Sequence, residues 1–114
     1  METVKQKKVQ NNTATRLHFL IIISNPRMQR HMLGVVNASH KRGHKITVFF
    51  NEESVKLLLE HNTLSRLPAD MLACVTACQY SGIKEEDFVE GARMTSLGEA
   101  IEIMQKADRT LFMG

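Results

Sequence analysis

The two cysteines, Cys74 and Cys78, are the residues whose type and spacing best suit covalent chemistry. They are the only cysteines among 114 residues, and they lie where an apolar run, residues 71–74, gives way to small side chains. If that run is a strand and residues 75–81 form a helix, Cys74 lies at a strand end and a helix N-terminus, which favours thiolate over thiol. The pattern therefore predicts a nucleophilic Cys74. The alternative is a buried, unreactive pair, because a free cysteine usually packs as a small apolar side chain.

The spacing of the pair limits its chemistry. Cysteines four residues apart share one face of a helix, whereas redox pairs of the thioredoxin type are spaced Cys-x-x-Cys, so no disulfide is indicated. No arginine follows Cys74 closely, which excludes the phosphate-binding loop of tyrosine phosphatases and rhodaneses. We also expect no metal site, because the histidines fall in different predicted elements without a ligand-like spacing; they are residues 18, 31, 40, 44 and 61.

Composition indicates one domain without a nucleic-acid face. The chain is 43% hydrophobic, enough for a core at this length, and its net charge is +3. The first 16 residues hold four basic side chains and one acidic, so the remainder is balanced. We expect residues 1–15 to form a disordered basic tail. There is no Trp and no basic, aromatic-rich cluster, so we expect no nucleic-acid binding. The longest apolar run is too short to span a membrane, so we expect no membrane insertion and a cytoplasmic location.

Strands and helices are predicted to alternate along the chain. The apolar segments 17–24, 46–50, 71–74, 91–95 and 110–113 are typical of strands. Helices are expected from Asn25-Pro26 to about residue 42, after the cap at Asn51, over residues 75–81, and after the capping-box pattern at Ser96. Residues 84–90 are expected to form a helical turn, and residues 61–69 a polar connection.

This alternation predicts a single three-layer α/β domain over residues 16–114, with about five parallel strands and helices on both faces. In such sheets ligands collect beyond the carboxyl ends of the strands, where Asn25, Asn51 and Cys74 would meet. Both asparagines would line this edge or cap turns there. The turn after the first strand has no glycine, so a dinucleotide fold is not indicated, and neither a P-loop nor a Gly-x-Ser-x-Gly elbow is present. A phosphoreceiver is also excluded, because Cys74 stands where that fold places an aspartate.

Three sequence blocks resemble the DsrE family of small α/β sulfur-relay proteins. They are Gly-His-Lys-Ile-Thr-Val-Phe-Phe at 43–50 with the leucines that follow, Cys-Val-Thr-Ala at 74–77 ending in Gly82-Ile83, and the segment from Glu90-Gly91 to Asp108-Arg109. In members that relay sulfur, the cysteine eight residues before the glycine carries a persulfide, and Cys74 stands eight before Gly82. The chain departs from the pattern at Tyr80-Ser81, where relay members tend to be basic, and at Cys78, which is an addition.

The resemblance implies an intracellular sulfur carrier. Cys74 would hold sulfane sulfur as a persulfide and pass it from a donor protein to an acceptor thiol, and Cys78 would be an auxiliary thiol or a packing residue. It also implies a homo-oligomer, a trimer or hexamer, and no cofactor is needed. The alternative is a non-catalytic assembly or ligand-binding subunit with structural cysteines.

Overall fold

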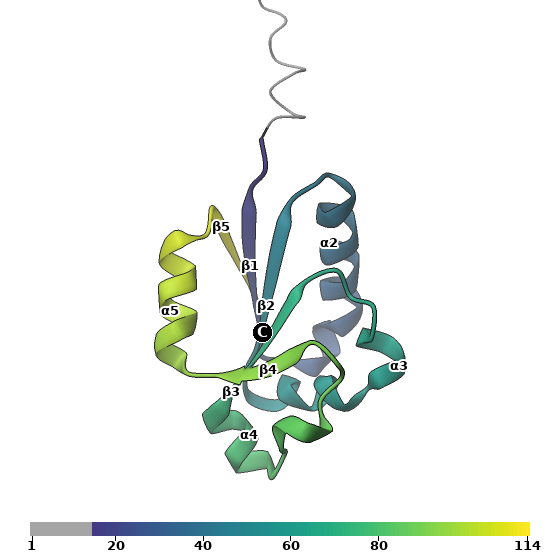
Figure 1. The fold of residues 1–114 in the computed structure, drawn as a ribbon, viewed down its shortest axis with the longest axis vertical. Helices are drawn as coiled ribbons and strands as arrows, with labels where there is room; N and C mark the ends of the chain where they lie inside the picture. The colour runs from purple at the N-terminus through teal and green to yellow at the C-terminus, as the bar shows by residue number, and fades with distance from the viewer. Residues whose placement is uncertain (1–14) are drawn as a thin grey trace, which may run out of the picture.

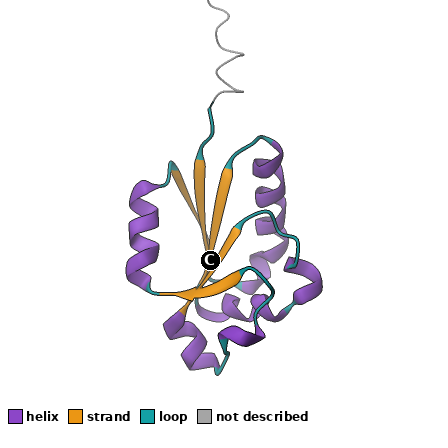
Figure 2. Cartoon of the chain, in the orientation of Figure 1, coloured by secondary structure: helices purple, strands orange, loops and turns teal. Residues whose placement is uncertain are grey.

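The computed structural model describes residues 15–114, and all its strands form one parallel sheet (Figures 1 and 2). Their order in the sheet is β4-β3-β2-β1-β5. The strands are β1 (His18–Ile23), β2 (Lys45–Phe50), β3 (Asp70–Cys74), β4 (Ala92–Thr95) and β5 (Arg109–Met113). The five-stranded parallel α/β fold predicted from the sequence is therefore confirmed.

Helical segments fill every crossover between strands. They are the 3₁₀ turn η1 (Pro26–Met28) with α2 (Gln29–Lys41), the 3₁₀ helix η2 (Glu52–Leu59) with α3 (His61–Leu64), α4 (Val75–Ser81) with η3 (Glu85–Asp87), and α5 (Leu97–Lys106). The first three crossovers all step in one direction along the sheet, whereas the last returns across it to β5. Right-handed crossovers therefore place α5 on the opposite face from the others, and Figure 1 shows α2 and α5 on opposite sides of the strands.

The core lies mainly between the sheet and the face that α2 and η2 cover. Met32 and Val36 of α2 and Val55 and Leu58 of η2 are completely buried. Opposite them, β1 and β2 are buried over most of their length, as expected for central strands of a parallel sheet. In contrast, α5 has one fully enclosed residue, Ala100, so the second face has a thinner cover.

One local prediction is corrected. The segment 61–69 is not simply a polar connection, because it contains α3, whose Leu64 is completely buried. A helix of four residues offers too few repeats for a periodic pattern, and burial of one leucine stabilises it instead. The helix predicted after the Asn51 cap is confirmed, and it is a 3₁₀ helix. The predicted basic tail lies outside the described residues, apart from Thr15, and no helix within residues 15–114 is both long and apolar enough to cross a membrane.

Candidate functional site

Cys74 occupies the junction between β3 and α4 that the sequence predicts. It is the last residue of β3 and the N-cap residue of α4, with an extended backbone (φ −64°, ψ 119°). Among the described residues its sulfur has no hydrogen bond to the first turn of α4. The residue is 7% exposed, so it lies at the boundary between core and surface.

A cavity of about 330 Å³ adjoins Cys74 at the carboxyl edge of the sheet. Its walls come from the start of η2 and from α4; they are Asn51, Glu52, Glu53, Thr76, Ala77, Tyr80 and Ser81. Tyr80 is 90% exposed and forms the outer rim. The cavity therefore connects Cys74 with the surface and would admit a small thiol or the end of a partner's side chain.

The charged side chains at this cavity are acidic. Two carboxylates, Glu52 and Glu53, line it, and no basic side chain among the described residues does so. Cys74 also adjoins the N-terminus of α4, a helix of seven residues. Sequence reasoning expected the helix N-terminus beside Cys74, and it missed the carboxylates because they follow a different strand.

Asn25 and Asn51 both cap helical turns. The Asn25 side chain accepts a hydrogen bond from the backbone N–H of Arg27, and the Asn51 side chain accepts one from that of Glu52. Asn51 also lines the Cys74 cavity, whereas Asn25 is not among its lining residues. Of the two asparagines expected at this edge, the structure brings only Asn51 into the cavity wall with Cys74.

Ser54 is a buried residue of this edge that sequence reasoning missed. Its hydroxyl donates to the backbone carbonyl of Ile23 and contacts that of Asn51 at 2.6 Å, and it accepts from the Asn51 N–H at 3.0 Å. This network joins the start of η2 to the end of β1. The signal was present as the capping-box spacing between Asn51 and Ser54, with Ser in place of Glu or Gln.

Glu52, at the start of η2, has an unusual backbone conformation. Its φ of 49° lies in the left-handed region, and it is the one non-glycine residue with positive φ in the described chain. This conformation costs about 1 kcal/mol for an L-residue other than glycine. The hydrogen bonds of the Asn51 and Ser54 side chains at the same turn offset that cost.

Cys78 lies in a different environment from Cys74, one turn further along α4. Both cysteines belong to the hydrophobic core, but Cys78 is completely buried whereas Cys74 is 7% exposed. Burial raises the pKa of the Cys78 thiol, and the nearby Cys74 and Glu85 raise it further. Both cysteines are free thiols. The structure thus places the two predicted site residues in one helix segment but gives only Cys74 a cavity to face.

No group of three or more His, Cys, Asp or Glu side chains among residues 15–114 is arranged to hold a metal ion. The histidines are instead dispersed: His18 bonds Thr47, His44 accepts from the Leu17 N–H, and His61 contacts the carbonyl of Asp87. Each of these contacts joins two segments of the chain. These contacts therefore help to hold the fold together.

Comparisons with known proteins agree with this architecture. The model of the DsrE/DsrF-like family matches residues 18–113. The crystal structure of the ychN protein from E. coli superposes with a TM-score of 0.73 at 14% identity, covering 87% of this chain and 100% of that one. A protein of unknown function from Methanobacterium thermoautotrophicum, MTH1491, gives a TM-score of 0.70 at 14% identity, covering 86% and 99% of the two chains.

At such identities the two structures support the fold and not a shared activity. No curated protein sequence matches the chain at a significant level. The family match is independent of the two solved structures. It covers every strand from β1 to β5, the α4 segment with both cysteines, and Gly82. The chain therefore belongs to the DsrE/DsrF-like family.

Proposed function

We propose that this protein carries sulfane sulfur on Cys74 and transfers it between protein thiols. The observation that carries this proposal is the difference between the cysteines: Cys74 adjoins a cavity at the carboxyl edge of the sheet, whereas Cys78 is enclosed in the core. Chemistry in parallel α/β sheets collects at this edge. The DsrE-like resemblance of the segment from Cys74 to Gly82 supports the same assignment.

The transfer consists of two thiol exchange steps. The Cys74 thiolate attacks the outer sulfur of a donor persulfide, a new S–S bond forms, the donor's S–S bond breaks, and the donor leaves as a thiolate that takes up a proton. An acceptor thiolate then attacks the outer sulfur of the Cys74 persulfide, which releases Cys74 as a thiolate. Sulfur moves from one thiol to another without net oxidation, so neither a metal nor an organic cofactor is required.

The acidic surroundings of Cys74 indicate what a donor or acceptor must supply. Glu52 and Glu53 line its cavity, and Tyr80-Ser81 stand where relay members tend to be basic. We expect a donor with lysine or arginine side chains around its persulfide, because these would neutralise the two carboxylates and stabilise the Cys74 thiolate on docking. Free thiols of this kind are kept reduced in the cytoplasm, where we place the relay.

We further propose that the protein functions as a homo-oligomer, a trimer or a hexamer. Four large apolar side chains of α5 and β5 are solvent-exposed in the single chain: Leu97 58%, Ile101 46%, Leu111 41% and Phe112 69%. Association of copies through these elements would remove them from water. Sedimentation velocity at micromolar concentration should return a trimer or larger species, and a purely monomeric sample contradicts this proposal.

Mass spectrometry after incubation with a persulfide donor tests the sulfur carrier. We expect the peptide that holds both cysteines to gain one sulfur in the wild type and in Cys78→Ser, and to gain none in Cys74→Ser. Both variants should be checked for unchanged unfolding midpoints. Sulfur uptake that survives in Cys74→Ser and is lost in Cys78→Ser would show that Cys78 is the carrier and would contradict the proposal.

The alternative function is a non-catalytic assembly or ligand-binding subunit. The low exposure of Cys74 and the two carboxylates at its cavity favour this alternative. The pH dependence of Cys74 alkylation separates the two functions. A midpoint below that of an ordinary thiol, about 8.5, supports the carrier, whereas a midpoint at or above it, together with absence of sulfur uptake, supports the assembly subunit.

A further inference from the structure

The sheet face beneath α5 holds a second cavity, at the opposite end of the strands from Cys74. Of the helices in the described part of the chain, α5 alone covers this face, and near the start of β2, β3 and β4 it leaves a space of about 340 Å³ beside its Ile103. Asp70, the first residue of β3, lines this cavity, while Cys74 is the last residue of the same strand. Four residue steps along a strand separate them by about 13 Å. The cavity is therefore independent of the proposed sulfur chemistry.

Strand register, rather than proximity in sequence, assembles the polar wall of this cavity. Neighbours in a parallel sheet that are paired in register present their side chains on the same face. Lys45 pairs with His18, Thr47 with Asp70, and Leu72 with Arg93. All six of these residues line the cavity, and they come from four adjacent strands.

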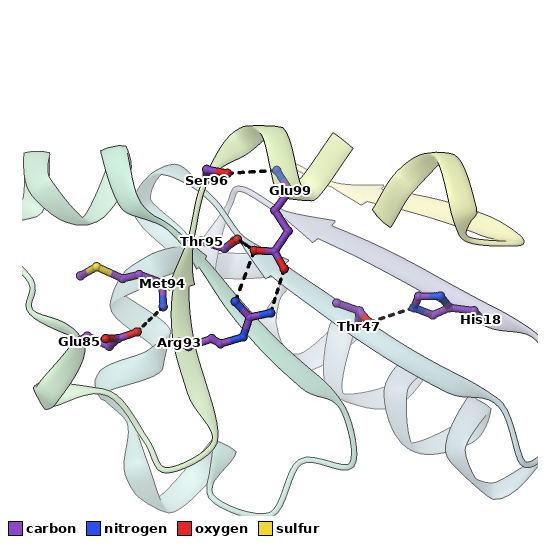
Figure 3. Close-up of polar contacts among 8 residues, drawn as sticks. All are labelled: His18, Thr47, Glu85, Arg93, Met94, Thr95, Ser96 and Glu99. Atoms are coloured by element: carbon purple, nitrogen blue, oxygen red, sulfur yellow. Dashed lines mark hydrogen bonds and ion pairs between the residues drawn. The ribbon is translucent and has the colours of Figure 1, made fainter. Parts of the chain in front are cut away.

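His18 and Thr47 form a neutral, hydrogen-bonded pair within this wall (Figure 3). The ring Nε2 of His18 lies 2.9 Å from Oγ1 of Thr47, which is 3% exposed. Burial lowers the pKa of His18, and the positive charge of Lys45 lowers it further, against smaller opposite effects of Asp108 and Asp70. The imidazole is therefore mainly neutral at pH 7 and offers a hydrogen bond without a charge.

The charged groups of the cavity have both signs. Arg93 is neutralised by Glu99 of α5, with N–O distances of 3.0 and 3.4 Å. Lys45 and Asp70 form no ion pair with any of the residues 15–114. A simple anion in the cavity would meet Lys45 favourably and Asp70 unfavourably, and a simple cation the reverse. A ligand with both charges would satisfy the two residues together.

We propose that this cavity binds a small zwitterion of the α-amino acid type. Its carboxylate would pair with Lys45, its ammonium group with Asp70, and its apolar side chain would lie against Leu72 and Ile103, which also line the space. Thr47 and neutral His18 supply further hydrogen-bonding atoms at the polar wall. A volume of about 340 Å³ is at the small end of ligand pockets, which suits a molecule of this size.

Three probes of nearly equal shape test the charge requirement on the full chain. L-Leucine carries both charges, 4-methylpentanoate lacks the ammonium group, and 3-methylbutylamine lacks the carboxylate. Binding is followed by the NMR signals of the His18 ring and of the Ile103 methyl groups, at millimolar ligand. We expect saturable shifts with L-leucine and binding weaker by about tenfold or more with either singly charged probe, because each lacks one charge-assisted hydrogen bond.

Two variants and two controls identify the residues involved. Asp70→Asn and Lys45→Gln should each weaken L-leucine binding by about tenfold or more. Glu86→Gln and Lys84→Gln remove the same charges from exposed positions outside the cavity and should leave binding unchanged. No saturable shift with L-leucine, equal binding of a singly charged probe, or unaltered binding in Asp70→Asn would each overturn the proposal.

Discussion

The two ends of the sheet differ in how far they are removed from water. In all five strands the first residue is exposed or half-buried and the last residue is buried. The carboxyl ends hold Cys74 and the Ser54 network, whereas the amino ends hold His18, Lys45 and Asp70. One end therefore has desolvated sulfur and hydroxyl groups, and the other has charged groups in contact with solvent.

Packing of the crossovers explains the difference. At the carboxyl ends, η2 and α4 contact each other and β3, so that Val55, Leu58 and Cys78 form a continuous apolar layer. At the amino ends, the face beneath α5 has no second helix from residues 15–114. At the carboxyl ends the Cys74 thiol meets solvent only through its cavity, whereas charges at the amino ends can exchange their hydration for a ligand. The two proposals follow this division.

Truncation of a buried side chain at the carboxyl end of β2 should have the largest effect. Phe50 is completely buried, so Phe50→Ala is expected to lower the free energy of unfolding by about 3 to 5 kcal/mol. Lys45→Ala, at the exposed start of the same strand, should change it by about 0.5 kcal/mol or less. Guanidinium unfolding monitored by circular dichroism measures both. If Phe50→Ala fails to fold, Phe50→Leu should still lower the free energy of unfolding by about 1 to 2 kcal/mol. Equal losses at the two ends of the strand would contradict the comparison.

Two buried hydroxyls sharpen the same comparison. Ser54→Ala removes a hydroxyl with three backbone contacts at the carboxyl end of the sheet and should lower the free energy of unfolding by about 1 to 2 kcal/mol. Thr47→Val, at the amino end of the sheet, should lower it by about 0.5 to 1 kcal/mol, because water in the adjoining cavity can replace the hydrogen bond to His18. The measurement is again chemical unfolding. A larger loss for Thr47→Val would show that its cavity excludes water.

The two thiols should differ in reactivity. Cys78 is completely buried and its pKa is raised, whereas Cys74 adjoins a cavity, so iodoacetamide should modify Cys74 faster by about tenfold or more. The rates are measured by mass spectrometry on Cys74→Ser and Cys78→Ser, each with one thiol left. Because the raised pKa makes the thiolate of Cys78 rarer, its labelling should increase more steeply above pH 8.5. Denatured protein is the control, in which the two rates should converge.

The smallest expected effect concerns His18 and pH. Its pKa in the folded chain lies below the ordinary value of 6.5 because of burial and Lys45, so the unfolded chain takes up a proton first as the pH falls. Stability should therefore be full above pH 6.5 and decrease as the pH falls from there through the folded pKa. His18→Gln should remove this part of the pH dependence. His31→Gln, at an exposed position of α2, is the matched control. Identical slopes for wild type and His18→Gln between pH 7 and 5 would contradict the assignment.

The sequence by itself determined the elements and the position of Cys74 among them. Continuous apolar runs predicted the buried strands, and local signals such as Asn51 and Ser96 marked helix starts, because capping and periodicity involve residues within one turn of each other. The strand-to-helix change at Cys74 is local for the same reason. The resemblance in the blocks around residues 43–50 and 74–83 identified the family that the match over residues 18–113 shows.

Only the tertiary structure decided what surrounds these residues. Cys74 and Cys78 look equivalent as a spaced pair, and both are buried, yet the packing of η2 and α4 leaves Cys74 beside a cavity with Glu52 and Glu53. The cavity of His18, Lys45 and Asp70 has no sequence signal, since its members are 25 or more residues apart and meet only through strand register. Local rules act along the chain, whereas burial, register and the sign of a neighbouring charge depend on contacts between segments that are distant in sequence.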